Sequence, residues 1–344
     1  MIASDFDEVW KNLAESPVPE SATGVIIRRI SPDLPHDFFQ GYEKISNRRM
    51  LLVRVDKREF NQFDQLPEFQ GFDISLLKFP DETPENIMVG FSLNDTSYSE
   101  IFSALCEDLV CIACKEINQK KMVQYIKERL LLWKQFLNIA GSHGLSPESQ
   151  RGLYGELRFL RDVMIPNTEI AKAISSWRGP SKANQDFQIS DISIEVKTSI
   201  AKQHQTIHVA NEQQLDDDGL KSLFIYFLSL REKPEHAETL PGIIDEIRKI
   251  IELKNGPAYE FETQLFKAGY IDKHRTKYLK PGYHDREIQI FRVDEDFPRI
   301  IERDLKAGVG DVKYSIDLSI CRKFRVSEED FISEFEWVNN DYIQ

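Results

Sequence analysis

The chain has 344 residues, of which 41% are hydrophobic and 29% are charged, and its formal net charge is −13. This composition is typical of a globular protein, and the length favours two domains with a third small element. No apolar run reaches about 18 residues and the acidic start lacks the pattern of a secretory signal, so we expect neither a membrane span nor secretion. Four cysteines argue against a disulfide scaffold, which favours a cytoplasmic protein.

Residues 1–118 are expected to form a β-rich domain that binds a partner or DNA. Short apolar runs separated by polar or proline-containing breaks predict an antiparallel sheet. The expected strands are residues 23–30, 49–55, 73–79 and 87–93. Apolar residues at steps of three and four then predict helices over 98–117 and 121–140. We assign residues 119–145 as a helical connector.

Residues 146–235 have a different pattern, with one long helix followed by short strands. Ser146 is a suitable N-cap and Pro147 suits the first turn, so a helix is predicted to residue 164. Strands are expected at 185–189, 192–198, 205–210 and 223–230, with a short helix after Asn211. Residues 236–344 are expected to be an α+β extension packed on this core. Its expected helices are 241–253, 259–269 and 327–335, and its expected strands are 286–293 and 312–320.

The first two of these strands are predicted to form a hairpin with Ser190 and Asp191 at its turn. Side chains alternate along a strand, so Glu195 and Lys197 share one face, roughly 7 Å apart. A turn centred between residues 190 and 191 places Asp186 opposite Glu195, with Cβ atoms about 5 Å apart. Two carboxylates held so close repel each other, and a divalent cation between them removes the repulsion. Hard oxygen ligands favour Mg²⁺ or Mn²⁺.

Glu156 is a further candidate on the preceding helix. It lies at the edge of the predicted buried stripe, about 60° from Leu153 by helical geometry, and it could point over the sheet edge. Gly152 and Gly155 lower helix propensity, which suggests a close approach of the helix to the sheet. The remaining members of the stripe are Leu157, Leu160 and Met164.

Each of these residues has an ordinary alternative explanation. Alternating acidic and basic residues on a strand are often a solvated face, Asp186 could be a turn residue, and Glu156 could be a surface residue. The combination of Asp, Glu-x-Lys nine residues later and an upstream G-x-x-G-E helix is much rarer than its parts. We therefore favour a functional site.

The segment resembles the PD-(D/E)XK phosphodiesterase superfamily, which has a restriction-endonuclease-like fold. That resemblance implies an α+β or α/β protein with an αβββαβ core and a mixed sheet, here preceded by the β-rich N-terminal domain. The motifs G-L-Y-G-E-L, W-R-G-P, Q-D-F and I-E-V-K-T resemble those of PD-(D/E)XK-motif proteins of prokaryotic defence clusters. The chain departs from the motif at one position, where Gln185 replaces proline before Asp186.

The resemblance implies a role for each matching residue. Asp186 and Glu195 would bind metal, Lys197 would be the catalytic lysine, and Glu156 would be the helix carboxylate. The N-E-Q-Q-L segment is similar to the glutamine-bearing helix of some superfamily nucleases, which makes Gln214 an accessory candidate. The carbonyl of Val196 as an extra metal ligand and Ser193 as a second accessory residue complete the predicted site.

Two segments are candidates for DNA binding. Trp177 and Arg178 precede the hairpin and could form the mouth of a cleft, or equally a packed loop anchor. Lys273, Arg275 and Lys277 lie in a segment with two tyrosines, which suits phosphate contact with base stacking, although a solvated loop is equally compatible.

These residues predict a magnesium-dependent DNA endonuclease that acts as one subunit of a multi-gene defence system. Its expected partners are DNA and other defence proteins, such as an ATPase or helicase subunit, and it could form a homodimer. The net charge of −13 means that DNA binding needs clustered basic residues, a metal or a partner. A non-catalytic adaptor on a nuclease fold, working through protein contacts, and an RNA-directed nuclease are the alternatives.

Overall fold

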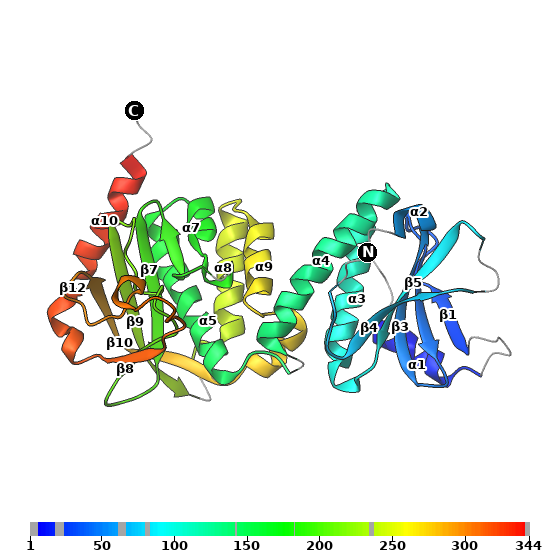
Figure 1. The fold of residues 1–344 in the computed structure, drawn as a ribbon, viewed down its shortest axis with the longest axis horizontal. Coiled ribbons are helices and arrows are strands. Elements are labelled where there is room, and N and C mark those ends of the chain that lie inside the picture. The colour runs from blue at the N-terminus through cyan, green and yellow to red at the C-terminus, as the bar shows by residue number, and fades with distance from the viewer. Residues whose placement is uncertain are drawn as a thin grey trace. The chain divides into compact units, whose positions relative to one another are not determined.

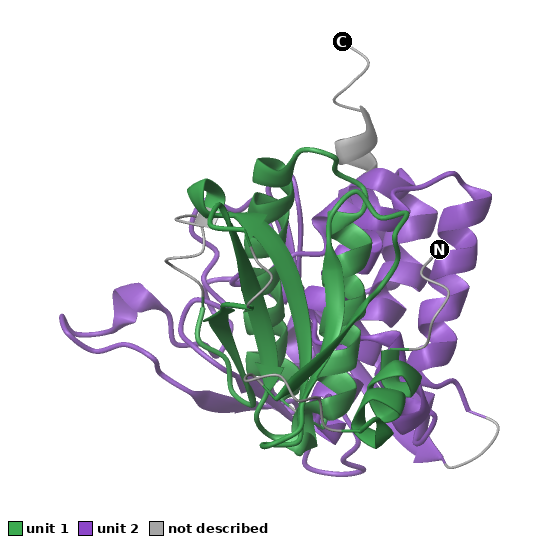
Figure 2. Ribbon diagram, turned by 90° about the vertical axis from the view of Figure 1, so that its right-hand side faces the viewer, with its two compact units in different colours: residues 1–143 green, residues 144–344 purple. Residues whose placement is uncertain are grey.

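The computed structural model describes residues 6–17, 24–60, 67–79, 83–141, 143–181, 183–233 and 237–340. The chain forms two compact units, Met1–His143 and Gly144–Gln344, which are coloured separately in Figure 2. No helix within the described ranges is both long enough and apolar enough to cross a lipid bilayer.

The first unit contains a five-stranded antiparallel sheet in the order β1-β2-β3-β5-β4. Its elements within the described residues are α1 (Phe6–Glu15), β1 (Val25–Arg29), β2 (Phe38–Glu43), β3 (Arg48–Asp56), α2 (Lys57–Phe60), β4 (Phe72–Leu77), β5 (Asn86–Leu93), the 3₁₀ turn η2 (Thr96–Tyr98), α3 (Ser99–Ala113) and α4 (Gln119–Ala140). Residue 23 of the expected first strand lies outside the described residues. β2 lies within the region predicted to be mostly strands, although it was not among the strands named from the sequence. Gln40 interrupts its apolar run and is buried, and its amide donates to the Phe6 carbonyl at 2.9 Å.

Helix α4 occupies most of the segment expected to be a connector, and it packs on α3 within the first unit. Asp108 on α3 holds the two helices together. Its carboxylate accepts hydrogen bonds from Arg129 Nε at 2.5 Å and from Trp133 Nε1 at 2.7 Å. The structure therefore assigns α4 to the β-rich unit.

The second unit contains a mixed five-stranded sheet in the order β12-β10-β9-β7-β6 (Figure 1), in which β7 and β9 are parallel and the other pairs are antiparallel. Its strands are β6 (Phe187–Ile189), β7 (Ile192–Ser199), β8 (Thr206–Val209), β9 (Ser222–Lys233), β10 (Gly282–Val293), β11 (Tyr314–Asp317) and β12 (Arg325–Val326). Its α-helices are α5 (Pro147–Phe159), α6 (Ile165–Asn167), α7 (Ile170–Ser176), α8 (Leu240–Leu253), α9 (Ala258–Lys267) and α10 (Glu328–Asn340). Shorter turns are η3 (Leu160–Met164, a π turn), η4 (Gly179–Ser181), η5 (Asp272–Tyr278), η6 (Glu302–Asp304) and η7 (Ile320–Phe324).

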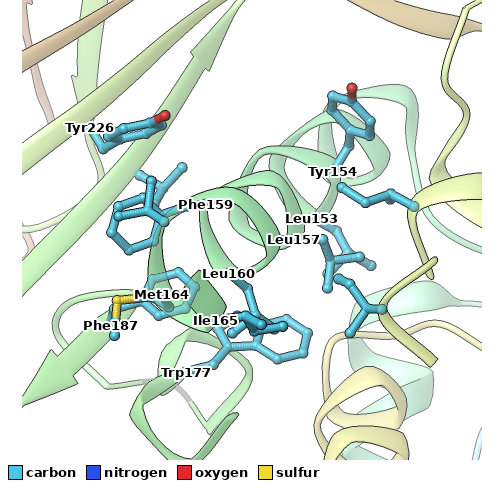
Figure 3. Packing of buried hydrophobic residues seen from close by; sticks show 14 of the residues in the cluster. Leu153, Tyr154, Leu157, Phe159, Leu160, Met164, Ile165, Trp177, Phe187 and Tyr226 are labelled. Carbon is cyan, nitrogen blue, oxygen red and sulfur yellow. The ribbon is translucent and has the colours of Figure 1, made fainter. Parts of the chain in front are cut away.

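Helix α5 begins as the sequence predicts and buries the expected stripe. Ser146 Oγ accepts a hydrogen bond from Ser149 N at 3.1 Å, which caps the helix. In Figure 3, Phe159 and the π turn that follows α5 lie close to Phe187 and Tyr226. The Phe159 ring centroid is 4.8 Å from each of these two rings. The predicted stripe residues Leu153, Leu157, Leu160 and Met164 are all buried in the same cluster.

The main sheet of the second unit separates two apolar layers. Ile192, Ile194 and Val196 belong to the cluster that includes residues of α5 and α8. Residues of β8, β11 and η7 cover the other face of β9 and β10. The alternation predicted for β7 is therefore confirmed, because its apolar residues face the helical layer and Ser193, Glu195 and Lys197 face the other way.

Two predicted elements of this core differ in the structure. The predicted strand at 205–210 forms β8, but β8 pairs with β11 in a separate two-stranded sheet. The segment after Asn211 is a turn rather than a helix, with Gln213 N and Gln214 N bonded to Asn211 Oδ1 at 3.0 and 3.1 Å. A run of acidic residues, 216–218, follows this turn, and negative charge at a helix C-terminus opposes helix formation.

The C-terminal segment completes the main sheet. β10 pairs with β9 along most of its length, and β12 pairs with β10. The expected helices at 241–253, 259–269 and 327–335 correspond to α8, α9 and α10, while the expected strand at 312–320 is shorter, at Tyr314–Asp317. The core and the extension thus form one sheet in one unit.

Candidate active site

The β6–β7 hairpin has the predicted register. Phe187 pairs with Ile194, and Ile189 pairs with Ile192 across the two-residue turn. Ser190 adopts a positive φ of 53° in this turn. Strand β6 begins at Phe187, so Asp186 lies just before the paired segment. Extending the register by one residue places Asp186 opposite Glu195.

Both the carboxylate and the backbone of Asp186 are held in place. Asp186 Oδ2 accepts a hydrogen bond from Val196 N at 2.8 Å. The Asp186 carbonyl accepts from Arg178 N at 2.7 Å and from Gly179 N at 2.9 Å. The carboxylate is half-buried, so it remains partly open to solvent. Because the N–H and C=O groups of a residue in an antiparallel pair point to the same neighbour, the Val196 carbonyl also faces this edge.

Glu195 and Lys197 form an ion pair on the face of β7 that is turned away from α5. Lys197 Nζ lies 2.7 Å from Glu195 Oε1 and donates to Gln214 Oε1 at 3.2 Å. The same Gln214 oxygen accepts from Ala210 N at 2.8 Å, so the turn that carries Gln214 reaches the site. Glu195 Oε2 and the hydroxyl of Ser193 are both buried, and neither has a hydrogen-bond partner among the residues that the structure describes. Glu195 therefore retains one unused oxygen toward the site.

Glu156 reaches the same region from α5. A Cβ on Gly155 would lie 2.3 Å from Thr198 Cγ2 on β7, so only glycine allows α5 to approach the strand this closely. The close approach predicted for Gly152 is wrong, because nothing lies within 4 Å of a Cβ built there. Glu156 Oε2 accepts a hydrogen bond from Trp177 Nε1 at 2.7 Å. The indole therefore orients this carboxylate.

Two of the carboxylates lie next to Gly179, a residue for which the sequence predicted no separate role. A Cβ at Gly179 would lie 2.8 Å from Asp186 Oδ1 and 3.0 Å from Glu156 Oε2. Both oxygens therefore lie close to one point that any larger residue would fill. The sequence shows a glycine after Trp177 and Arg178, shortly before the predicted hairpin. Sequence spacing alone does not show which side chains lie next to this glycine.

Electrostatic repulsion dominates the site. Burial raises the pKa of Glu156 to about 7, and the charge of Glu195 adds to this rise. Burial and then the charges of Glu195 and Glu156 raise the pKa of Asp186 well above its usual range. Burial also raises the pKa of Glu195, although Lys197 opposes the rise. Three carboxylates thus share a single ammonium group.

The pKa of Lys197 is raised as well. Burial lowers the pKa of this amine, but the charges of Glu195, Asp186 and Glu156 outweigh burial. Lys197 therefore stays protonated at neutral pH. It can donate hydrogen bonds and stabilise negative charge, but it has no free base with which to remove a proton from water.

The residues of this site fit a divalent cation. Within the described ranges, no three His, Cys, Asp or Glu side chains are already grouped to hold a metal ion. The unpartnered oxygen of Glu195 and the oxygens of Asp186 and Glu156 beside Gly179 are nevertheless hard ligands with excess negative charge. A cation bound to them would relieve the repulsion that raises their pKa values.

The arrangement suits phosphodiester chemistry. A bound divalent cation would supply Lewis-acid activation of a phosphodiester. The Lys197 ammonium would stabilise the charge that develops on phosphate oxygens. Gln214 and Glu195 hold this ammonium in place, and Trp177 and Val196 hold the other two carboxylates through neutral N–H donors.

The candidate DNA-binding residues are arranged differently from the prediction. Trp177 is fully buried, which fits the alternative of a packed loop anchor and excludes contact of its ring with DNA at the mouth of a cleft, whereas Arg178 is exposed. Arg275 forms an ion pair with Asp245 at 2.5 Å. The two tyrosines of that segment, Tyr278 and Tyr283, are buried and cannot stack on bases. Lys273 and Lys277 are exposed.

Comparison with known proteins agrees with this geometry. The family model described as "Putative PD-(D/E)XK family member, (DUF4420)" matches residues 6–319. The chain belongs to this family. The match covers nearly the whole chain and therefore includes most of the β-rich unit. No curated protein and no solved structure matches the chain.

Proposed function

We propose that the protein is a metal-dependent DNA endonuclease. The observation that carries this proposal is the convergence of Asp186, Glu195 and Glu156 on one ammonium group, Lys197, with Glu195 Oε2 buried and unpartnered. A purely structural cluster of three carboxylates would be destabilising, because their mutual repulsion and burial oppose folding at neutral pH. The excess negative charge of the carboxylates suits a bound cation, and the ammonium group suits a phosphodiester.

The proposed roles follow from the contacts. Asp186 and Glu195 hold Mg²⁺ or Mn²⁺, with the Val196 carbonyl as a further ligand and Glu156 as an auxiliary carboxylate. Lys197 stabilises the charge on the phosphate. Ser193 and Gln214 are accessory residues: the Gln214 amide orients Lys197, and the Ser193 hydroxyl lies on the same face of β7.

The net charge of −13 bears on how the protein reaches DNA. Phosphate contacts supply most non-specific DNA affinity, so an acidic endonuclease gains from a partner that binds DNA itself. We propose that the chain works as one subunit of a defence system with an ATPase or helicase subunit, with homodimer formation as a further possibility. In this arrangement the β-rich unit would provide the partner or DNA contact.

The direct test is cleavage of plasmid DNA and of RNA in Mg²⁺, with and without candidate partner proteins. Asp186→Ala and Lys197→Ala should both abolish cutting. Lys202→Ala is the matched control, because Lys202 is an exposed lysine that follows β7 and makes no contact with the carboxylates. Its cutting rate should equal that of the wild type.

The acidity of the chain also favours a second candidate, a nuclease-fold adaptor that acts through protein contacts. The two candidates differ in a phage-challenge assay. An endonuclease loses protection with Asp186→Ala and with Lys197→Ala, whereas an adaptor keeps it. Absence of cutting under every condition, together with wild-type protection by both variants, would reject the nuclease and support the adaptor. Cutting of RNA but not of DNA would instead indicate an RNA-directed nuclease.

A further inference from the structure

A cavity of about 480 Å³ lies in the second unit next to the candidate active site. Its volume is in the range of about 300–1,000 Å³ that is usual for small-ligand pockets. The walls come from the residues before β6, from β6 itself, from the turn after β8 and from η6. Amide side chains dominate this lining: Asn184, Gln185, Gln188 and Gln213.

The cavity and the candidate active site share a wall. Gln185 immediately precedes Asp186, and its Nε2 donates to the carbonyls of Gln213 at 3.2 Å and Gln214 at 3.3 Å. Gln214 in turn accepts a hydrogen bond from Lys197. The cavity lining therefore adjoins the active site through Gln185, which precedes Asp186, and through the Gln213–Gln214 turn, which contacts Lys197.

Three of the amides are available for a ligand. The side chains of Asn184, Gln188 and Gln213 are exposed, and they form no hydrogen bond with any residue that the structure describes. Each amide offers a donor and an acceptor in one plane. Together they provide the paired donor and acceptor groups that a planar heterocycle uses.

The charges of the lining argue against a phosphate. Asp216, Asp218 and Glu302 contribute carboxylates, and none of the lining residues that the structure describes is Lys or Arg. Carboxylates repel phosphate at short range, so the cavity does not fit the nucleic acid backbone. Carboxylates and amide oxygens instead accept hydrogen bonds from N–H groups.

We propose that this cavity binds a nucleobase that carries an exocyclic amine on its major-groove edge, adenine or cytosine rather than guanine, whose amine lies on the minor-groove edge, next to the phosphate that the site cuts. Asn and Gln side chains form paired hydrogen bonds with adenine N6 and N7, and Asp and Glu accept from cytosine N4. Thymine has no exocyclic amine and fits this lining less well. The position of the base beside the cut rests on the proposed endonuclease function, whereas base-dependent binding does not.

The first experiment measures binding without cutting. Fluorescence anisotropy follows labelled single-stranded oligonucleotides of dA, dC or dT in the presence of Ca²⁺, which takes the same oxygen ligands as Mg²⁺ and offsets the repulsion between the carboxylates and phosphate. The wild type should bind dA or dC more tightly than dT by about 5- to 100-fold, the discrimination that one good amide–base pair provides. Gln188→Ala with Gln213→Ala, and separately Asp218→Ala, should reduce this ratio toward one. Gln203→Ala, an exposed glutamine outside the cavity, is the matched control and should keep the ratio.

The second experiment sequences the ends that the wild type produces from a randomised DNA library in Mg²⁺. Adenine or cytosine should be enriched at one fixed position beside the cut, and the Gln188→Ala and Gln213→Ala double variant should lose this enrichment while it still cuts. If only one of these two bases is enriched, that base is the one that the cavity binds.

The outcomes separate this proposal from the proposed function. Cutting without any base preference, or a preference that the cavity variants keep, overturns the cavity proposal and leaves the endonuclease intact. Base-dependent binding that the variants remove, without any cutting, supports the cavity and rejects the endonuclease. Equal binding of all three oligonucleotides, or no binding, rejects the cavity as a nucleobase site; loss of partner-protein binding in the same variants would then assign it to a basic protein segment.

Discussion

Helix α5 contributes to two clusters of charged side chains, and the clusters differ in how their charges are matched. In the first cluster Arg158 contacts Asp162 and Asp285, each at 2.6 Å. Arg161, in the π turn that follows α5, contacts Glu238. Every carboxylate of this first cluster therefore contacts a guanidinium group.

The second cluster is the candidate active site. Among the described residues, Glu195 is the one of its three carboxylates that contacts a cation, Lys197. Within the described ranges, the Asp186 carboxylate accepts a hydrogen bond only from the backbone amide of Val196, and the Glu156 carboxylate only from the indole of Trp177. Both donors are neutral. Carboxylates that are paired with guanidinium groups stabilise the fold, whereas carboxylates without a cationic partner retain the capacity to bind an added cation.

The largest expected effect separates activity from stability at the second cluster. Asp186→Asn keeps an oxygen that can accept from Val196 N but removes one repelling charge. Cutting should fall by at least about 100-fold, which corresponds to about 2.7 kcal/mol of transition-state stabilisation. The free energy of unfolding without divalent cation should rise. Urea denaturation and plasmid cleavage measure both, and a destabilised variant would show that Asp186 is structural.

The opposite result is expected at the first cluster. Glu238→Gln removes a charge that contacts Arg161, and its side chain is 23% exposed. The free energy of unfolding should fall by about 2 kcal/mol, below the 3–5 kcal/mol typical of fully buried pairs. Cutting should remain at the wild-type rate. Glu246→Gln is the control, because Glu246 contacts the same arginine but is 55% exposed, and it should change stability by less than about 1 kcal/mol.

A smaller effect is expected from the indole that orients Glu156. Trp177→Phe removes the N–H donor and keeps an aromatic ring in the core. Cutting should fall by about tenfold, the equivalent of about 1.4 kcal/mol, which is typical of one lost hydrogen bond. In a Glu156→Gln background the same substitution should cause much less further loss. An equal loss in both backgrounds would mean that Trp177 acts only through packing.

A separate effect is expected on the pH dependence of stability. The pKa of Glu156 is raised to about 7 in the folded protein from an ordinary value of 4.5. Its contribution to stability is therefore fully present below about pH 4.5 and is lost as pH rises through about 7. Without divalent cation, the melting temperature should fall over this window, and Glu156→Gln should make the fall shallower. A fall of equal size in both proteins would contradict the raised pKa.

Local patterns predicted much of the second unit from the sequence. Alternation along residues 192–198 gave the polar face of β7, and the Ser190–Asp191 turn gave the hairpin register that the structure has. The stripe on α5 also follows from helical periodicity alone. These features depend on residues close together in the chain, so the sequence carries the information directly.

Features that depend on distant contacts were not predictable in this way. β8 pairs with β11, which lies more than a hundred residues later, and nothing in its own alternation distinguishes this partner from the main sheet. The sequence left two alternatives for Trp177, the mouth of a cleft or a packed loop anchor, and the structure has the second: Trp177 is buried and its indole N–H donates to the Glu156 carboxylate. The role of Gly179 likewise depends on two side chains from separate elements.

The most direct test of the unmatched-charge account is calorimetric titration of Mg²⁺ and Mn²⁺ into the wild type, Glu195→Gln and Glu238→Gln. The wild type should bind the cation and release protons near pH 7, because its carboxylates have raised pKa values. Glu195→Gln should bind at least about tenfold more weakly, since ligand charge sets affinity for hard cations. Glu238→Gln should bind as the wild type does. Equal binding of Mg²⁺ by the wild type and Glu195→Gln would contradict the account.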